Sequence, residues 1–229
     1  MTKRWVTLSF LMLISYSFLF GQQVITAERY LEMVSENYSS IRDYEANLAI
    51  RSGNSEMIGN VSHLEPSFLR VDFTRPAEQV IVFNGESLTV YLPEFRAVLN
   101  QDISQNRRTG IAGAGFASAS GLSLLRRNYV PSFVTGPNPE PLDPGSSEMI
   151  IRLRLSRRSI SEGFREIILS INPNTLLIRR IEGRTIADGD VRFDFTNIRT
   201  NLNIPEQRFI YDTPAMANMY NNFLFRDAD

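Results

Sequence analysis

The sequence predicts a mainly β protein of the α+β class, with one helix followed by about ten strands in an antiparallel meander. Three observations predict it. An amphipathic helical pattern comes first, short alternating segments bounded by turn residues follow, and a single central segment departs from that alternation. At 229 residues the chain is long enough to bury one large core.

The first 21 residues are typical of a secretory signal peptide. Lys3 and Arg4 provide a positive start, and Trp5 to Phe20 is an uncharged, mostly apolar run before Gly21. The run is shorter than the ~20 residues that span a bilayer as a helix, so an uncleaved anchor is the alternative. Because no Cys follows the run, we expect an exported periplasmic protein that is not lipid-anchored.

The remaining chain, 22–229, is predicted to be one domain that begins with a helix. Thr26 is a suitable N-cap, and apolar residues recur at three- and four-residue steps from Leu31 to Ile41. From Tyr44 the period becomes two. Strands are predicted at 44–50, 57–64, 68–74, 79–83, 87–92, 95–99, 148–156, 164–172, 175–182, 191–198 and 208–211. Asn84-Gly85 predicts a tight hairpin.

Two segments differ from this pattern. Residues 102–147 combine a Gly, Ala and Ser stretch with five prolines, and they indicate an insert without strands. Leu122, Leu124 and Leu125 before Arg126 and Arg127 favour a short helix there, with a mobile surface loop as the alternative. Thr213-Pro214 and the apolar residues after it predict a C-terminal helix over 213–225.

The composition argues against several classes of protein. With 24 Lys plus Arg against 25 Asp plus Glu, the chain lacks the basic excess of a nucleic-acid binder. The absence of Cys and the single His63 exclude thiolate and two-histidine metal sites and leave a hydrolase triad without support. No phosphate-binding glycine fingerprint is present. We therefore expect no enzyme, no catalytic residues, no metal and no cofactor.

A series of motifs from 66 to 93 supports a family resemblance. A proline-led strand at 66–73 is followed by Pro76, by Ile81-Val82-Phe83-Asn84-Gly85, and by the strand 88–93 that ends in Tyr91-Leu92-Pro93. In this order and spacing, behind a signal sequence, they resemble the periplasmic outer-membrane lipoprotein carrier family, called LolA-like. The likeness is good over about a quarter of the chain, fair over another quarter and poor between 102 and 148.

The resemblance implies a curved antiparallel sheet of about ten or eleven strands that forms an unclosed half-barrel. An N-terminal helix and a helical or loop lid, at 102–147, would cover an apolar cavity. Proteins of this family shuttle lipoproteins by hiding their acyl chains from water. The implied partners are lipoprotein acyl chains or another lipid, an inner-membrane ABC-type release complex and an outer-membrane acceptor. We expect a monomer that binds no nucleic acid.

The alternating apolar residues of the strands are the candidate lining of that cavity. Leu69, Val71 and Phe73 occupy positions that face the cavity in the family. The other lining candidates are Leu48, Ile50, Val80, Val82, Leu88 and Val90, and the lid candidates are Leu122, Leu124 and Leu125. Ordinary core packing is the alternative for all of them, since half-buried strands alternate in the same way.

One position departs from the family pattern. Glu65 stands where the family has an Arg that latches the lid, so that role does not carry over. Either Glu65 pairs with Arg126 or Arg127 in a reversed latch, or it is a surface turn residue. We interpret His63 as an ordinary strand histidine, because no partner motif accompanies it.

The resemblance leaves a second function open beside the carrier. A periplasmic regulatory protein on the same half-barrel would sense lipid or lipoprotein and report to a membrane partner. Sensors of this kind carry an extra C-terminal domain, and the chain ends soon after Tyr211. The carrier is therefore the preferred prediction.

Overall fold

The computed structural model describes residues 25–103, 115, 117–186 and 189–222. The predicted signal peptide, 1–21, lies outside the described residues. So do residues 104–114 of the predicted lid segment and 223–225 of the predicted C-terminal helix. None of the helices in the described ranges is long and apolar enough to cross a membrane.

Helix α1 (Ala27–Ser39) begins where the sequence predicts. Thr26 has an extended backbone, and its side-chain oxygen accepts a hydrogen bond from the Arg29 amide at 3.2 Å. This bond satisfies one of the free amides of the first turn. The buried face of α1 includes Leu31, Val34 and Tyr38, so the apolar stripe packs against the rest of the protein.

Thirteen strands are found in the described part of the chain. They are β1 (Asp43–Ser52), β2 (Ser55–Leu64), β3 (Phe68–Arg75), β4 (Val80–Phe83), β5 (Ser87–Leu92), β6 (Ala97–Asp102), β7 (Tyr129–Phe133), β8 (Glu140–Pro141), β9 (Met149–Arg157), β10 (Phe164–Ile171), β11 (Ile178–Thr185), β12 (Asp190–Thr200) and β13 (Asn218–Asn221). Two short 3-10 helices, η1 (Pro93–Phe95) and η4 (Glu206–Phe209), interrupt the strands.

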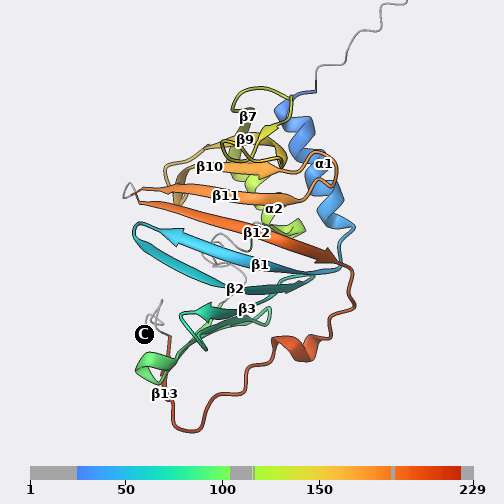
Figure 1. Cartoon of the computed structure of the whole chain (residues 1–229). Helices are drawn as coiled ribbons and strands as arrows, with labels where there is room; N and C mark the ends of the chain where they lie inside the picture. Colours follow the sequence, from blue (N-terminus) through green and yellow to red (C-terminus); the bar gives the residue numbers. More distant parts are fainter. Residues whose placement is uncertain (1–24, 104–114, 116, 187–188, 223–229) are drawn as a thin grey trace, which may run out of the picture.

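The strands form one curved sheet that does not close into a barrel (Figure 1). Its order is β13-β6-β5-β4-β3-β2-β1-β12-β11-β10-β9-β7, with β8 paired to β9. Neighbouring strands are antiparallel except β13 and β6, which are parallel. The half-barrel that the resemblance implies is thus confirmed, with β7 and β13 as its two edges.

Each face of the sheet packs against different elements. The inner face, defined here as the face toward α1 and the second helix α2 (Ala119–Asn128), shares one large apolar core with both helices. The outer face of β3 and β4 is covered by the segment after β12, where Ile204 and Phe209 pack on Val82 and Leu64. The buried Asp43 carboxylate fastens that segment by accepting hydrogen bonds from the amides of residues 202 and 203, at 2.6 and 3.1 Å.

The central segment contains the predicted short helix and also two strands that the sequence analysis missed, β7 and β8. Helix α2 ends at Asn128 with Arg126 and Arg127 in its last turn, as predicted. Strand β7 then pairs with β9, so the expectation of no strand in 102–147 is wrong. Pro131 lies inside β7, which is tolerated because β7 is an edge strand.

The C-terminal segment is not helical in its described part. Residues 218–221 form β13, and the Asn218 amide donates to the Arg96 carbonyl at 2.7 Å. The predicted helix over 213–225 is therefore wrong for residues 213–222. Backbone pairing with the free edge of β6 outweighs the local helical pattern. No strand forms at 208–211 either, because Arg208 and Phe209 end η4 and residues 210 and 211 are irregular.

Candidate functional site

The inner face of β3 carries the three leading candidates. Leu69, Val71 and Phe73 alternate along the strand, and their exposed fractions are 5%, 2% and 4%. All three belong to the large core that includes α1 and α2. The sequence therefore predicts their common face correctly.

The pairing of the strands places residues of β1, β2 and β5 on the same inner face. Leu48 and Ile50 of β1 and Leu88 of β5 are buried in the same core, and Val90 packs against it. Leu48 lies opposite Gly59 of β2, and Gly59 lies opposite Phe73. A Cβ atom at position 59 would lie 2.3 Å from the Asp72 carbonyl oxygen, so this close approach of β2 to β3 requires glycine.

Two candidates on β4 lie on the opposite face. Val80 pairs with Asp72 and Val82 with Arg70, and both valines pack in the outer cluster with Ile204 and Phe209. Their assignment to the inner face is wrong. Strand β4 is apolar at all four positions, so it lacks the polar alternation that distinguishes two faces.

Ile81 and Phe83 take the inner positions of β4 instead, and Ile81 belongs to a strip of paired residues that leads to the sheet edge. Val71 pairs with Ile81, Ile81 with Val90, Val90 with Leu99, and Leu99 with Tyr220. We call Val71, Ile81, Val90, Leu99 and Tyr220 the inner strip. Its exposure rises from 2% at Val71, through three half-buried residues, to 53% at Tyr220. The inner face is thus most open at its β13 edge.

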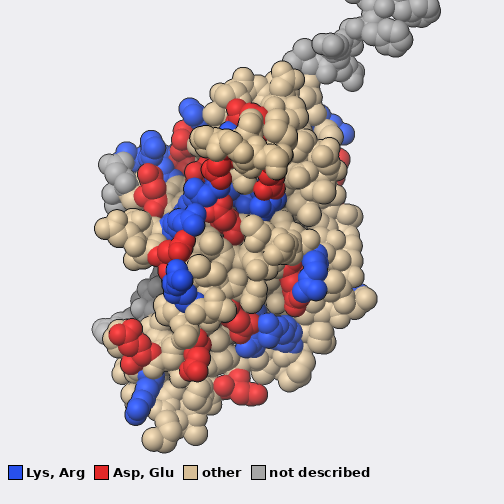
Figure 2. All heavy atoms as spheres, viewed as in Figure 1, with Lys and Arg blue, Asp and Glu red and all other residues tan. Residues whose placement is uncertain are grey.

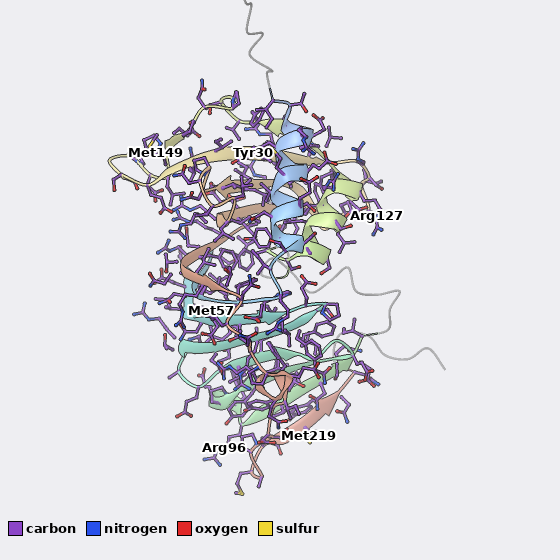
Figure 3. The ribbon with its side chains drawn as sticks, turned by 90° about the vertical axis from the view of Figure 1, so that its right-hand side faces the viewer. Tyr30, Met57, Arg96, Arg127, Met149 and Met219 are labelled. Carbon is purple, nitrogen blue, oxygen red and sulfur yellow. The ribbon has the colours of Figure 1, made fainter. Side chains whose placement is uncertain are left out.

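The predicted lid residues separate into two groups. Leu122 and Leu125 are fully buried in the inner core, whereas Leu124 is half-buried and lies outside the set of buried core residues. Helix α2 packs against α1 and β7. Figure 3 shows α1 with Tyr30 and α2 with Arg127 at one end of the molecule, and Arg96 and Met219 at the other.

Glu65 contacts the start of α2, but by a route that the sequence analysis did not consider. Its carboxylate accepts a hydrogen bond from the Ala119 amide at 3.3 Å, next to the N-cap Ser118. Burial raises the pKa of Glu65. Arg126 bonds instead to Glu32 of α1 at 3.0 Å, so the reversed pair between Glu65 and Arg126 is not formed. A carboxylate at a helix N-terminus is favourable because of the helix dipole.

A polar pair, Tyr44 and His63, interrupts the apolar inner face beside β3. The two rings stack with centroids 5.2 Å apart, and each side chain is at most 4% exposed. Burial lowers the pKa of His63 to about 4, so the imidazole is neutral near pH 7. The sequence interpretation of an ordinary strand histidine fits this position, whereas the Tyr44 partner was not predicted.

Most arginines of β9, β11 and β12 are paired with acids, and Figure 2 shows basic and acidic side chains interleaved on this side of the molecule. Arg180 bonds to Asp143 and Asp194 at 2.8 and 2.6 Å, and Arg179 bonds to Glu148. A pocket of about 450 Å³ near the β1–β2 and β11–β12 turns is lined mainly by such charged residues. That lining does not suit an acyl chain, and the apolar cavity stays a prediction. Among the described residues, no three His, Asp or Glu side chains gather as metal ligands.

Comparison with known proteins identifies relatives by structure. No family model matches the sequence, and no curated protein gives a significant match. An uncharacterized conserved protein from Thermus thermophilus superposes with a TM-score of 0.54 at 15% identity, over 85% of this chain and 98% of that one. MucB superposes with a TM-score of 0.52 at 14% identity, over 81% of this chain and 62% of MucB.

A LolA superfamily protein from Nitrosomonas europaea also matches, at a TM-score of 0.41 and 16% identity, over 82% of this chain and 98% of that one. The superpositions on the Thermus thermophilus protein and on MucB show that this chain shares its overall fold with them. A LolA-like fold is what the motifs between 66 and 93 imply, and the sheet around them has the predicted open, curved form.

Proposed function

We propose that the protein is exported to the periplasm, shields the acyl chains of lipoproteins or of another lipid against its inner face, and carries them from the inner to the outer membrane. The observation that carries this proposal is the inner strip. It is apolar over five strands, buried at Val71, half-buried at its three middle residues and exposed at Tyr220 on the β13 edge.

A carrier of this kind must bury an acyl chain with nearly the same gain in free energy as the membrane does. Each buried CH₂ contributes about 0.8 kcal/mol, so a sixteen-carbon chain in water costs on the order of 10 kcal/mol. A broad apolar face with few polar contacts supplies that burial without fixing the chain too tightly for release. The three half-buried residues of the strip offer apolar surface that a ligand can cover.

The proposed partners are those that the family resemblance implies. We propose that an inner-membrane ABC-type release complex supplies the lipoprotein and that an outer-membrane acceptor receives it from a monomeric carrier. No covalent step is needed for this transfer, and we propose no enzymatic activity.

The test is acyl binding by two matched variants on β5. Val90 and Thr89 are adjacent and both half-buried, but Val90 lies on the inner face and Thr89 pairs with Val82 on the outer face. We expect Val90→Gln to weaken binding of a fluorescent sixteen-carbon fatty acid at least tenfold, and Thr89→Gln to leave it within twofold. Equal affinity in both variants, or no binding by the wild type, contradicts the carrier.

MucB has been solved in complex with a partner protein, MucA, and the likeness to MucB favours one alternative, a lipid- or lipoprotein-sensing regulatory protein that reports to a partner protein. Both functions require acyl binding, so transfer distinguishes them. A carrier moves a triacylated peptide from donor vesicles to acceptor vesicles at a rate that rises with protein concentration. A sensor binds the peptide without accelerating its transfer.

A further inference from the structure

The Tyr44 hydroxyl is a buried polar group without a protein partner. The side chain is 3% exposed, and within the described residues no group lies at hydrogen-bonding distance from its oxygen. A buried hydroxyl that makes no hydrogen bond costs free energy, and such groups are few in native proteins. The neighbouring Tyr38 shows the usual arrangement, since its hydroxyl accepts the Ile178 amide at 3.0 Å.

Tyr44 lies at one end of an apolar row on the inner face. It pairs with His63, His63 with Leu69, Leu69 with Phe83, and Phe83 with Leu88. This row runs beside the inner strip, because Leu69 and Val71 are two residues apart on β3. Leu69, Phe83 and Leu88 are themselves buried in the core, so an acyl chain would have to insert between this row and the residues packed on it to bring its end near the Tyr44 and His63 rings.

The acidic residues near Tyr44 determine which charge a ligand group beside its hydroxyl can carry. Burial raises the pKa of Tyr44 well above its usual value, and the negative charge of Glu65 contributes to the rise. The phenol therefore stays protonated and can donate a hydrogen bond. Asp43 lies close enough to His63 to affect its pKa. The carboxylates of Asp43 and Glu65 therefore both disfavour a negatively charged ligand group next to Tyr44 and His63. A neutral acceptor fits better than a free carboxylate.

We propose that the Tyr44 hydroxyl donates a hydrogen bond to the carbonyl oxygen of an acyl ester, and that the protein thereby prefers esterified acyl chains to chains without a carbonyl. The inference rests on the proposed function, because it requires an acyl chain on the inner face. It adds the chemical class of the ligand and the residue that recognises it.

The experiment compares two probes that differ only in the carbonyl group. One is a fluorescent sixteen-carbon fatty acid as its methyl ester, and the other is the corresponding methyl ether. We expect the wild type to bind the ester about tenfold more tightly, and Tyr44→Phe to lose that preference while its affinity for the ether is unchanged. Because Phe keeps the stack on His63 and no protein hydrogen bond is broken, the melting temperature of the ligand-free variant should not fall.

Tyr30→Phe is the matched control. Tyr30 is 4% exposed and its hydroxyl also has no partner among the described residues, but it lies on α1 beside Phe133, outside the row that Tyr44 begins. We expect this variant to keep the ester preference.

Three results would overturn the inference alone. They are equal binding of the two probes by the wild type, equal weakening of both probes in Tyr44→Phe, and loss of the ester preference in Tyr30→Phe. If the wild type binds neither probe, the proposed function fails as well.

Discussion

A histidine takes an inner-face position at which the neighbouring alternation predicts an apolar side chain. Val61 precedes His63 by two residues on β2, and Leu69 lies opposite it on β3. The imidazole is 4% exposed, and burial depresses its pKa from 6.5 to about 4. A buried neutral base makes the stability of the folded state sensitive to acid.

The sign of the pH effect follows from proton uptake. Between pH 6.5 and pH 4 the unfolded state protonates His63 and the folded state does not, so stability is lost as the pH falls through this window. The shift corresponds to about 3 kcal/mol. We expect His63→Phe, which keeps the stack on Tyr44, to lose about that much less stability than the wild type between pH 7 and pH 4, as measured by urea unfolding.

The measured pH dependence of stability also contains a contribution from Glu65, which must be separated from that of His63. Burial raises its pKa, so its titration opposes that of His63, and only the difference between variant and wild type isolates the histidine. If the free energy of unfolding of His63→Phe and of the wild type falls by the same amount between pH 7 and pH 4, then His63 takes up its proton equally in the folded and unfolded states, and the prediction is wrong.

Individual residues also show how far sequence reasoning reaches. Leu69, Val71 and Phe73 alternate with Arg70 and Asp72, and this contrast places them on the inner face. Strand β4 has no such contrast, so its pattern alone misassigns both valines, and only the register of β3 and β4 separates the two faces. The role of Glu65 depends on an amide more than fifty residues away, which no local pattern reveals.

At the scale of the elements, local signals predict a helix when its ends carry their own capping groups. Thr26 marks the start of α1, and the arginines in the last turn of α2 mark its end. Strands β7 and β13 lack comparable signals. Pro131 argues against β7, and all four residues of β13 are exposed, so these strands form only because the sheet offers them an edge.

Helix α2 should depend strongly on its N-cap, because it has only ten residues. The Ser118 hydroxyl is buried and accepts the Gly121 amide at 3.0 Å. We expect Ser118→Ala to cost about 1 kcal/mol and to speed hydrogen exchange of the first-turn amides of α2. Ser123→Ala, at an exposed position of the same helix, should change neither quantity. Equal effects of the two variants in hydrogen exchange would show that the cap does not hold the helix.

In the described part of the chain the sheet is open, with β7 and β13 at its two ends, and the strand pattern does not predict how the helices are distributed over it. The family resemblance implies a half-barrel, but the distribution of helices over it depends on long-range packing. Helix α1 packs against α2 and β7, at the β7 end of the sheet. The inner strip runs to the other end and finishes at the exposed Tyr220. For the proposed carrier, we therefore expect acyl chains to reach the inner face over the β13 edge.

Two adjacent residues of β13 test this route without disturbing the core. Tyr220 pairs with Leu99 on the inner face and Met219 pairs with Val98 on the outer face, and they are similarly exposed, at 53% and 56%. An acyl chain that enters over this edge would have to pass a carboxylate at position 220 and remove water from it, which costs free energy. The same carboxylate at position 219 faces outward and stays in water. We expect Tyr220→Glu to slow uptake of a fluorescent fatty acid from vesicles about tenfold, in stopped-flow measurements, and Met219→Glu to leave the rate within twofold. Equal rates in the two variants would place the route of uptake elsewhere on the sheet, since both substitutions introduce one charge at one edge strand.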